Sequence, residues 1–217
     1  HDAVREETTM APHRSVHAFT ARFFPHSSVS LRWAVAAFAL LAALCWASPA
    51  WAADSAVFAS GAGTEADPYL IENASQLAAF RDAVNAGDDY DGKYVALGAD
   101  IDLESAEWTP IGVGTRKSSG IAEGSTPFAG TFDGAGHVIS GLKIASTQGA
   151  DFAIGLFGIL DGATVKNLTV ADAEVTVPQS ELAGILCGMM ANDATASGVS
   201  VSGSVSGKAG VGGIAGR

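Results

Sequence analysis

The chain has 217 residues, of which 48% are hydrophobic and 16% charged, and its formal net charge is −11. This much apolar surface excludes a disordered polyelectrolyte, and the length suits one or two domains. The acidic balance also argues against nucleic acid or an anionic membrane as a partner, because binding phosphate needs clustered Lys and Arg.

The N-terminal part of the chain has the pattern of an export signal. Residues 1–9 carry the acidic side chains of this region, and we interpret them as an upstream extension. Basic residues without acids follow, then the apolar run of residues 33–46, then the small residues Ala50 and Ala52. This order predicts a secretory signal peptide over residues 10–52, cleaved after about Ala52. An uncleaved anchor is the alternative, but the apolar run is shorter than the roughly 20 residues that span a bilayer.

The rest of the chain has few residues that bind metals. It contains eight Lys plus Arg, twenty Asp plus Glu, one cysteine (Cys187) and one histidine (His137). These counts exclude an intramolecular disulfide, and they exclude zinc sites of four cysteines or of two cysteines and two histidines. We predict no cofactor, and we expect Cys187 to be a buried, inert thiol.

The first expected elements are a linker, a short strand and a helix. Residues 53–62 are small and polar and predict the linker, and a strand is expected just before Asn73. Asn73 can cap a helix, with Gln76 reaching back as in a capping box. Apolar residues at helical spacing follow, and Gly87 ends the pattern, so we predict a helix over residues 74–86.

After Gly87 the sequence indicates brief strands separated by glycines. A polar excursion at residues 114–127 is expected to be an exposed loop. The expected strands are at residues 94–97, 101–103, 138–139, 142–144 and 165–170.

Two internal repeats are the most informative feature. The segment at residues 155–158 (GLFG) recurs at residues 184–187 (GILC) and 213–216 (GIAG), with the same step between successive copies. A second pattern has apolar residues at its first, fourth and sixth positions and Gly or Asn at the third. It occurs at residues 139–144, 165–170 and 196–201.

A fixed period of this size is typical of a solenoid, in which each unit buries its apolar face against its neighbours. The units are too small for helix pairs, and Gly or Asn can adopt the left-handed conformation that a sharp corner requires. We therefore predict an all-β fold, a parallel β-helix over residues 63–217 with one N-terminal capping helix. A glycine-rich sandwich or a low-complexity linker is the alternative.

The segment at residues 128–144 resembles the F-x-G-T-F-D-G-x-G-H-x-I-x-G-L-x-I segment of bacterial surface proteins. The GLFG segment and its later copies are similar to the short glycine-rich GLUG repeat, although Cys187 replaces the second glycine of its copy. Residues 67–71, 100–103 and 108–112 follow the order that this family shows.

This resemblance implies a right-handed parallel β-helix near the N-terminus of a larger secreted or wall-attached protein, truncated here at its C-terminal end. Such modules occur in adhesin-like proteins and in immunoglobulin-A-cleaving metallopeptidases. The chain has no H-E-x-x-H zinc motif, so the catalytic domain of such a peptidase would be absent from it.

Four residues are candidates for catalysis. Asp100 and Asp102 alternate in an expected strand and project to one face, and paired carboxylates can cleave glycosidic bonds. Asp133 and His137 lie four residues apart, so His137 could act as a general acid or base. The simpler interpretation is a solvated face for Asp100 and Asp102 and a tight turn for Asp133 and His137.

Two further groups could bind ligands. Asp88, Asp89 and Asp91 crowd a turn and could hold calcium, although the segment is far shorter than a full calcium loop. Four phenylalanines could form a sugar platform, but their spacing favours the core, whereas Trp108 is the better candidate for exposure. The phenylalanines are Phe128, Phe132, Phe152 and Phe157.

We predict a non-catalytic function, the rod-like N-terminal part of a secreted or cell-surface adhesin-like protein that is itself part of a longer chain. A host or environmental glycan or protein is the expected ligand class. The alternatives are a glycan-cleaving β-helix enzyme that uses paired Asp residues, and the N-terminal region of a secreted metallopeptidase.

Overall fold

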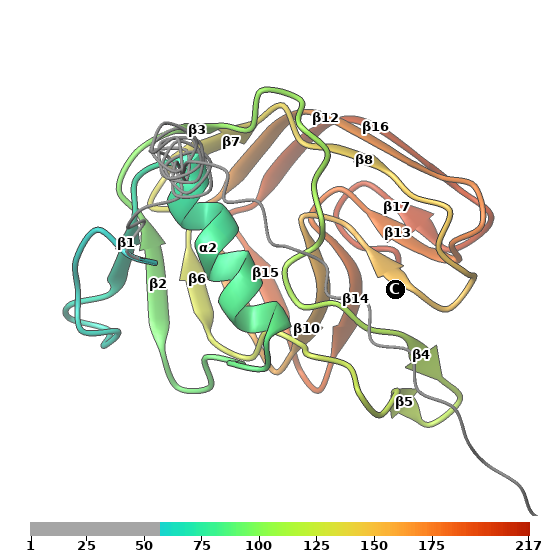
Figure 1. Cartoon of the computed structure of the whole chain (residues 1–217), viewed down its shortest axis with the longest axis horizontal. Coiled ribbons are helices and arrows are strands. Elements are labelled where there is room, and N and C mark those ends of the chain that lie inside the picture. The colour runs from blue at the N-terminus through green and yellow to red at the C-terminus, as the bar shows by residue number, and fades with distance from the viewer. Residues whose placement is uncertain (1–56) are drawn as a thin grey trace, which may run out of the picture. The chain divides into compact units, whose positions relative to one another are not determined.

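The computed structural model describes residues 57–217, so the predicted extension and signal peptide lie outside the described residues. The described part of the chain is mostly β, with a single α-helix (Figure 1). Within it, no helix has the length and apolar character needed to cross a bilayer.

The strands form four parallel sheets and one hairpin. The first sheet has the order β1 (Tyr69–Ile71), β2 (Tyr94–Leu97), β6 (Thr131–Asp133), β11 (Thr164–Lys166) and β15 (Thr195–Ser197). The second has the order β3 (Ile101–Asp102), β7 (Val138–Ser140), β12 (Thr169–Val177) and β16 (Ser200–Gly207), and β8 (Lys143–Ala145) also pairs with β12. The third sheet has the order β9 (Ala153–Ile154), β13 (Leu182–Gly184) and β17 (Val211–Gly212). The fourth pairs β10 (Phe157–Asp161) with β14 (Cys187–Ala191).

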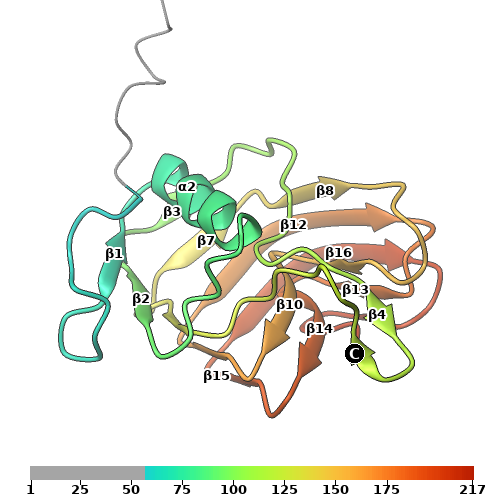
Figure 2. The same ribbon diagram turned by 60° about the horizontal axis from the view of Figure 1, so that its bottom comes forward.

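Strands that pair with each other belong to successive windings of the chain. Thr131 pairs with Thr164 one winding later, and Ala183 pairs in the same way with Val211. Every named strand pair is parallel except the hairpin of β4 (Arg116–Lys117) and β5 (Gly120–Ile121). The sheets curl around a shared core, and Figure 2 shows β8, β12 and β16 side by side and running in the same direction. We call each winding a coil.

The three copies of the GLFG segment lie next to one another. The Leu156 N–H donates to the Ile185 carbonyl at 3.0 Å, and the Ile185 N–H donates to the Gly213 carbonyl at 2.9 Å. A Cβ atom on Gly184 would lie 2.3 Å from the Cys187 carbonyl oxygen, so this position requires glycine. Leu156 and Ile185 are buried, whereas Ile214 in the third copy is 40% exposed.

The sequence aligns Ile139 with Val165 as equivalent positions of the second repeat, but the structure does not pair them. Val165 pairs with Phe132 and Ala196. Ile139 pairs with Val170, which lies one corner further along the coil than Val165. The predicted left-handed residue is present in all three copies, with φ of 68° at Gly141, 52° at Asn167 and 62° at Gly198. Successive corners of one coil use the same pattern, so the pattern alone does not distinguish them.

Helix α2 (Ala74–Asn85) closes the core next to β6. Asn73 Oδ1 accepts a hydrogen bond from the Gln76 N–H, which confirms the predicted N-cap. The Gln76 side chain reaches back as predicted, but it accepts from the Glu72 N–H, one residue before the N–H that a capping box uses. Phe80 is fully buried and packs on Phe132 with ring centroids 6.1 Å apart. The helix therefore covers the core with a single apolar face.

Two segments are more ordered than the sequence indicates. Residues 58–60, within the predicted linker, lie against β1, where the Phe58 ring stacks on Tyr69 at 4.3 Å and Ser60 bridges Leu70. The predicted loop at residues 114–127 contains the β4–β5 hairpin. Its Arg116 side chain lies 3.3 Å from the Asp151 carboxylate.

Candidate functional site

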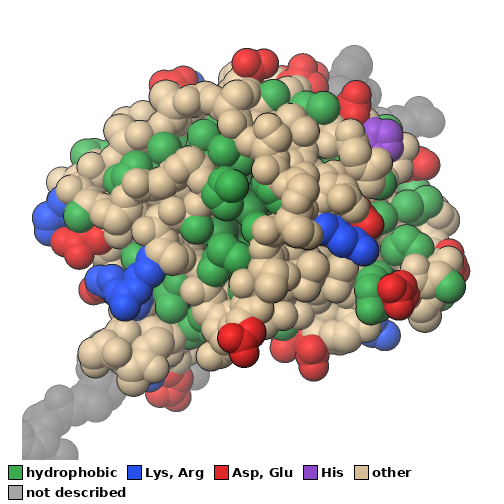
Figure 3. Space-filling model, turned by 180° about the vertical axis from the view of Figure 1, so that it is seen from behind, with side chains coloured by type: hydrophobic (Ala, Val, Ile, Leu, Met, Phe, Trp, Pro, Cys, Tyr) green, Lys and Arg blue, Asp and Glu red, His purple; other side chains and the backbone are tan. Residues whose placement is uncertain are grey.

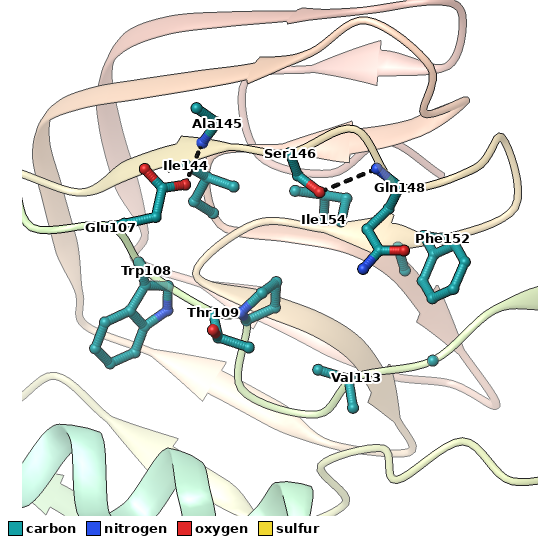
Figure 4. A pocket seen from close by; sticks show the side chains of 13 residues that line it. Glu107, Trp108, Thr109, Val113, Ile144, Ala145, Ser146, Gln148, Phe152 and Ile154 are labelled. Atoms are coloured by element: carbon teal, nitrogen blue, oxygen red, sulfur yellow. Dashed lines mark hydrogen bonds between the residues drawn. The ribbon is translucent and has the colours of Figure 1, made fainter.

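An open groove lies between segments that are distant in the sequence (Figure 4). One wall consists of residues 107–114, and the opposite wall of residues 144–148 at the end of β8 and beyond. Phe152 and β9 close the third side. The groove has a volume of about 360 Å³, which falls at the small end of the roughly 300–1,000 Å³ typical of ligand sites. Glu107 is the only charged side chain that lines it.

The groove exists because the chain takes a short path on one side. Glu107 bridges Lys143 and Ile111 bridges Phe157, both in parallel. The path from Glu107 to Ile111 is much shorter than the matching path from Lys143 to Phe157. The earlier coil therefore lacks the lobe that the later coil has between these two points. As a result, the end of β8 pairs with β12 along one edge and faces the groove along the other.

Helix α2 braces the short wall through a single side chain. Asn85 Nδ2 donates to the Pro110 carbonyl at 3.0 Å. Asn85 Oδ1 accepts from the Gly112 N–H at 2.8 Å and from the Val113 N–H at 3.2 Å. An asparagine amide supplies both the donor and the acceptor that these backbone groups need. The wall is therefore held in one conformation by a residue outside it.

Trp108, the better candidate for exposure from the sequence, is buried. Only 6% of its surface is accessible, and its Nε1–H donates to the Leu156 carbonyl at 3.2 Å. The Arg81 guanidinium lies 4.8 Å from the ring centroid, in a cation–π arrangement. The chain turns inward between Glu107 and Ile111, and this short path places the indole in the core.

Glu107 satisfies a backbone donor at the edge of β8. Its carboxylate accepts a hydrogen bond from the Ala145 N–H, as Figure 4 shows. Ser146 Oγ accepts from the Gln148 N–H at 3.2 Å and shapes the loop after β8. Ser180 is fully buried, and its hydroxyl donates to the Phe152 carbonyl at 2.8 Å. These contacts fix the wall opposite Trp108 and the side that Phe152 closes.

The candidate catalytic residues lie outside the groove, and two of them, Asp100 and His137, contact each other. Asp100 Oδ1 lies 3.0 Å from His137 Nδ1 and accepts from the Val138 N–H at 3.0 Å. The Val138 N–H, followed by the His137 side chain, lowers the pKa of Asp100. Asp102 Oδ1 accepts from the Glu104 N–H at 2.8 Å. Asp100 and Asp102 are both exposed on either side of buried Ile101, as expected for a solvated face.

Asp133 belongs to a different cluster from His137. Its carboxylate lies 3.3 Å from Lys166 Nζ, and it accepts hydrogen bonds from the Asn167 side chain at 3.1 Å and the Ala135 N–H at 2.8 Å. Burial alone raises the pKa of Asp133, but the hydrogen bonds and the Lys166 charge outweigh it, so the net pKa is lowered. Asp133 therefore stabilises the corner between β11 and β12.

The three aspartates proposed for calcium lie at an exposed turn. Asp89 Oδ1 accepts from the Asp91 N–H at 3.0 Å, and the Asp89 carbonyl accepts from the Ala129 N–H. Across residues 57–217, no group of three or more His, Cys, Asp or Glu side chains has a metal-binding arrangement. Asp88 lies next to this turn, and its charge contributes, after burial, to a pKa of about 12 for Tyr90.

The phenylalanines and the cysteine divide between the core and the groove. Phe128, Phe132 and Phe157 are fully buried, as their spacing predicts, and Phe157 stacks on Phe128 and meets Phe132 edge to face. Phe152 is only half-buried and lines the groove. Cys187 is fully buried, and this burial raises its pKa to about 12.

Sequence reasoning missed Asn85, Glu107 and the walls of the groove. The signal available in the sequence was the short distance between β3 and Ile111. The W-T-P-I-G segment at residues 108–112 leaves no room for a further strand before Ile111. Figure 3 shows the molecule from behind the view of Figure 1, with most acidic and basic side chains around the margin of that view and hydrophobic side chains across its middle.

No family model matches this chain. It is 37% identical over 138 residues to a "Putative Gly-rich membrane protein" of Evansella cellulosilytica, and 32% identical over 159 residues to Halomucin of Haloquadratum walsbyi. These matches cover 63% and 72% of the chain, but only 15% and 2% of the two relatives. A crystal structure described as a "putative immunoglobulin A1 protease from Bacteroides ovatus" matches 59% of the chain and 33% of that protein. Its sequence identity is 29% and its TM-score is 0.42.

Proposed function

We propose that residues 63–217 are coils of a right-handed parallel β-helix that serves as a non-catalytic spacer in a secreted or cell-surface protein. Export through the signal peptide at residues 10–52 and GLUG-type repeats are part of this proposal. The observation that carries it is the parallel register, because strands of the last three coils pair one winding apart around one core.

Stacked coils suit a spacer because each coil seals the apolar interior of the next, so length is added without a new core. Two relatives, a Gly-rich membrane protein and Halomucin, have names that agree with a surface location. The chain spans a small part of both relatives, and we propose the same relation here: one module within a long surface protein.

The electrostatics of the candidate catalytic residues also favour a structural role. A general acid must hold its proton near neutral pH, which requires a raised carboxyl pKa. The pKa values of Asp100 and Asp133 are lowered, and each carboxylate accepts hydrogen bonds from the backbone of a corner. These two residues therefore suit the cohesion of the coils better than glycan cleavage.

Coil duplication tests the proposal. Because Asp161 pairs with Ala191, a copy of residues 162–191 inserted after Ala191 restarts the coil in register. We expect small-angle X-ray scattering to show an increase of about 4.8 Å in length per copy, with one cooperative unfolding transition. Inserted copies that unfold separately would contradict the proposal. Polysaccharide turnover by the chain that is lost in Asp100→Asn would instead favour the glycan-cleaving enzyme.

A further inference from the structure

The groove exposes a strand edge with the chemistry to bind another strand. The Ser146 N–H donates to the Thr176 carbonyl of β12, so Ser146 points its backbone groups away from the groove. Neighbouring residues of a strand point to opposite edges, which turns both the N–H and the C=O of Ala145 toward the groove. The carbonyl of Lys143, two residues earlier, already accepts from the Trp108 N–H at 2.8 Å. The ladder of hydrogen bonds therefore stops at Ala145.

The Glu107 side chain occupies the position that the next strand would take at this edge. Its carboxylate takes the hydrogen bond from the Ala145 N–H that a strand carbonyl would take in a continued sheet. A side chain on the neighbouring segment thus caps an open edge, one of the ways in which proteins protect edges from pairing. Glu107 is exposed, and it is a cap that an incoming backbone carbonyl can displace.

The groove also has the lining that an added strand requires. Ile144 and Ile154 are buried at its base, and half-buried Val113 and Phe152 flank it, so alternate side chains of a strand find apolar contacts. With Glu107 as its single charge, and a formal net charge of −11 for the chain, the site favours a neutral or basic segment over an acidic one.

We propose that this groove binds an extended peptide segment, which adds as a parallel strand beside β8 and displaces the Glu107 carboxylate from the Ala145 N–H. Strand addition to an exposed edge is a general mode of peptide recognition, in which main-chain hydrogen bonds provide affinity. The site continues the hydrogen bonding of the β16–β12–β8 sheet by one strand. Binding of this kind does not depend on the spacer role.

The repeat supplies a probe peptide. β12 accepts β8 on its edge with Lys143, Ile144 and Ala145 opposite residues 174–176, so a copy of the β8 segment should fit the edge of β8 itself. Because Glu107 already bridges Lys143, a peptide has no room beside the residues before Ile144. The probe is therefore a fluorescein-labelled peptide with the sequence of residues 144–150, Ile-Ala-Ser-Thr-Gln-Gly-Ala, titrated with the full chain. By the same register, the N–H of the peptide serine donates to the Ala145 carbonyl and the N–H of its first alanine points away.

We expect fluorescence anisotropy to show binding of the probe. N-methylation of its serine should weaken binding about three- to tenfold, and N-methylation of its first alanine should leave it unchanged. In the chain, Glu107→Ala should strengthen binding because it frees the Ala145 N–H, and Ala145→Pro should weaken it because it removes that donor. Glu65→Ala, which makes the same charge change outside the groove, is the matched control.

Three outcomes would overturn the proposal. These are no binding of the probe, equal binding of the two N-methylated peptides, and binding of the neutral sugar maltotriose that Phe152→Ala abolishes and Ala145→Pro does not affect. The N-methylated peptides test the mode of binding on the unaltered chain, so the result stands even where Ala145→Pro fails to fold.

Discussion

Asn85 on helix α2 holds the backbone of Pro110 through a hydrogen bond of 3.0 Å from its side-chain amide to the carbonyl oxygen. The same side chain accepts from the Gly112 and Val113 N–H groups. One residue thus fixes the short wall of the groove to the helix that closes the core. The stability of the fold and the shape of the groove are therefore coupled at a single position.

Asn85→Ala should lower the free energy of unfolding by about 1–3 kcal/mol, because it leaves part-buried backbone groups without partners. Asn85→Asp retains the acceptor for Gly112 and Val113, but when ionised it places a carboxylate oxygen against the Pro110 carbonyl oxygen. Its effect should be smaller than that of Asn85→Ala only in acid, where the protonated carboxyl can donate to that carbonyl. Urea denaturation followed by circular dichroism measures both variants at neutral and acidic pH. Equal losses in the two in acid would show that the side-chain hydrogen bonds contribute nothing.

Gly184→Ala should destabilise the chain by about 1–3 kcal/mol or more, because its Cβ would lie 2.3 Å from the Cys187 carbonyl oxygen and must displace backbone. Gly213 is the matched control, since it has the same repeat position but its nearest heavy atom would be 3.6 Å away. Gly213→Ala should change the thermal midpoint little. Similar shifts in both variants would contradict the close contact between Gly184 and the Cys187 carbonyl.

Asp133 should contribute stability that depends on pH. Its pKa is lowered in the folded state from the ordinary value of 3.8, so its contribution is present above that value and is lost as the pH falls through the folded pKa. Asp133→Asn should therefore reduce the free energy of unfolding at neutral pH and have little effect in strong acid, below the folded pKa. Denaturation under both conditions tests this, with the exposed Asp91→Asn as the control.

Cys187 should be unreactive in the folded protein. Burial raises its pKa to about 12, so little thiolate forms and reagents have no access to the sulfur. In a Cys45→Ser background, which leaves Cys187 as the single thiol, iodoacetamide should modify the chain only as it unfolds. Rapid labelling under native conditions would refute this placement.

The sequence was sufficient to predict the helix and its cap, and to predict that the copies of the GLFG segment lie next to one another. Asn73 and Gln76 predicted the start of α2, and the recurrence of the GLFG segment placed Leu156 beside Ile185. These features depend on residues close in the chain or on an exact period. The predicted alignment of Ile139 with Val165 is wrong, because Ile139 pairs with Val170. Two corners of a coil have the same pattern, an inward residue followed by a left-handed one, so the pattern alone does not tell them apart.

The groove could not be predicted in this way, because it results from a short connection and not from a residue pattern. A sequence pattern predicts the strand or helix that its residues form. The space beside Ala145 exists because the path from Glu107 to Ile111 has too few residues to fill it. The burial of Trp108, a candidate for exposure, was not predictable for the same reason, since it follows from the turn of that path into the core. Its aromatic character alone is compatible with either environment.

The short path between Glu107 and Ile111 means that recognition at this surface is governed by chain length. An insertion at that turn, as long as the absent lobe, would fill the docking position with the protein's own backbone. A deletion of similar size in a neighbouring winding would open a second one. Modules of this kind can thus gain or lose an attachment point while their interior side chains stay the same.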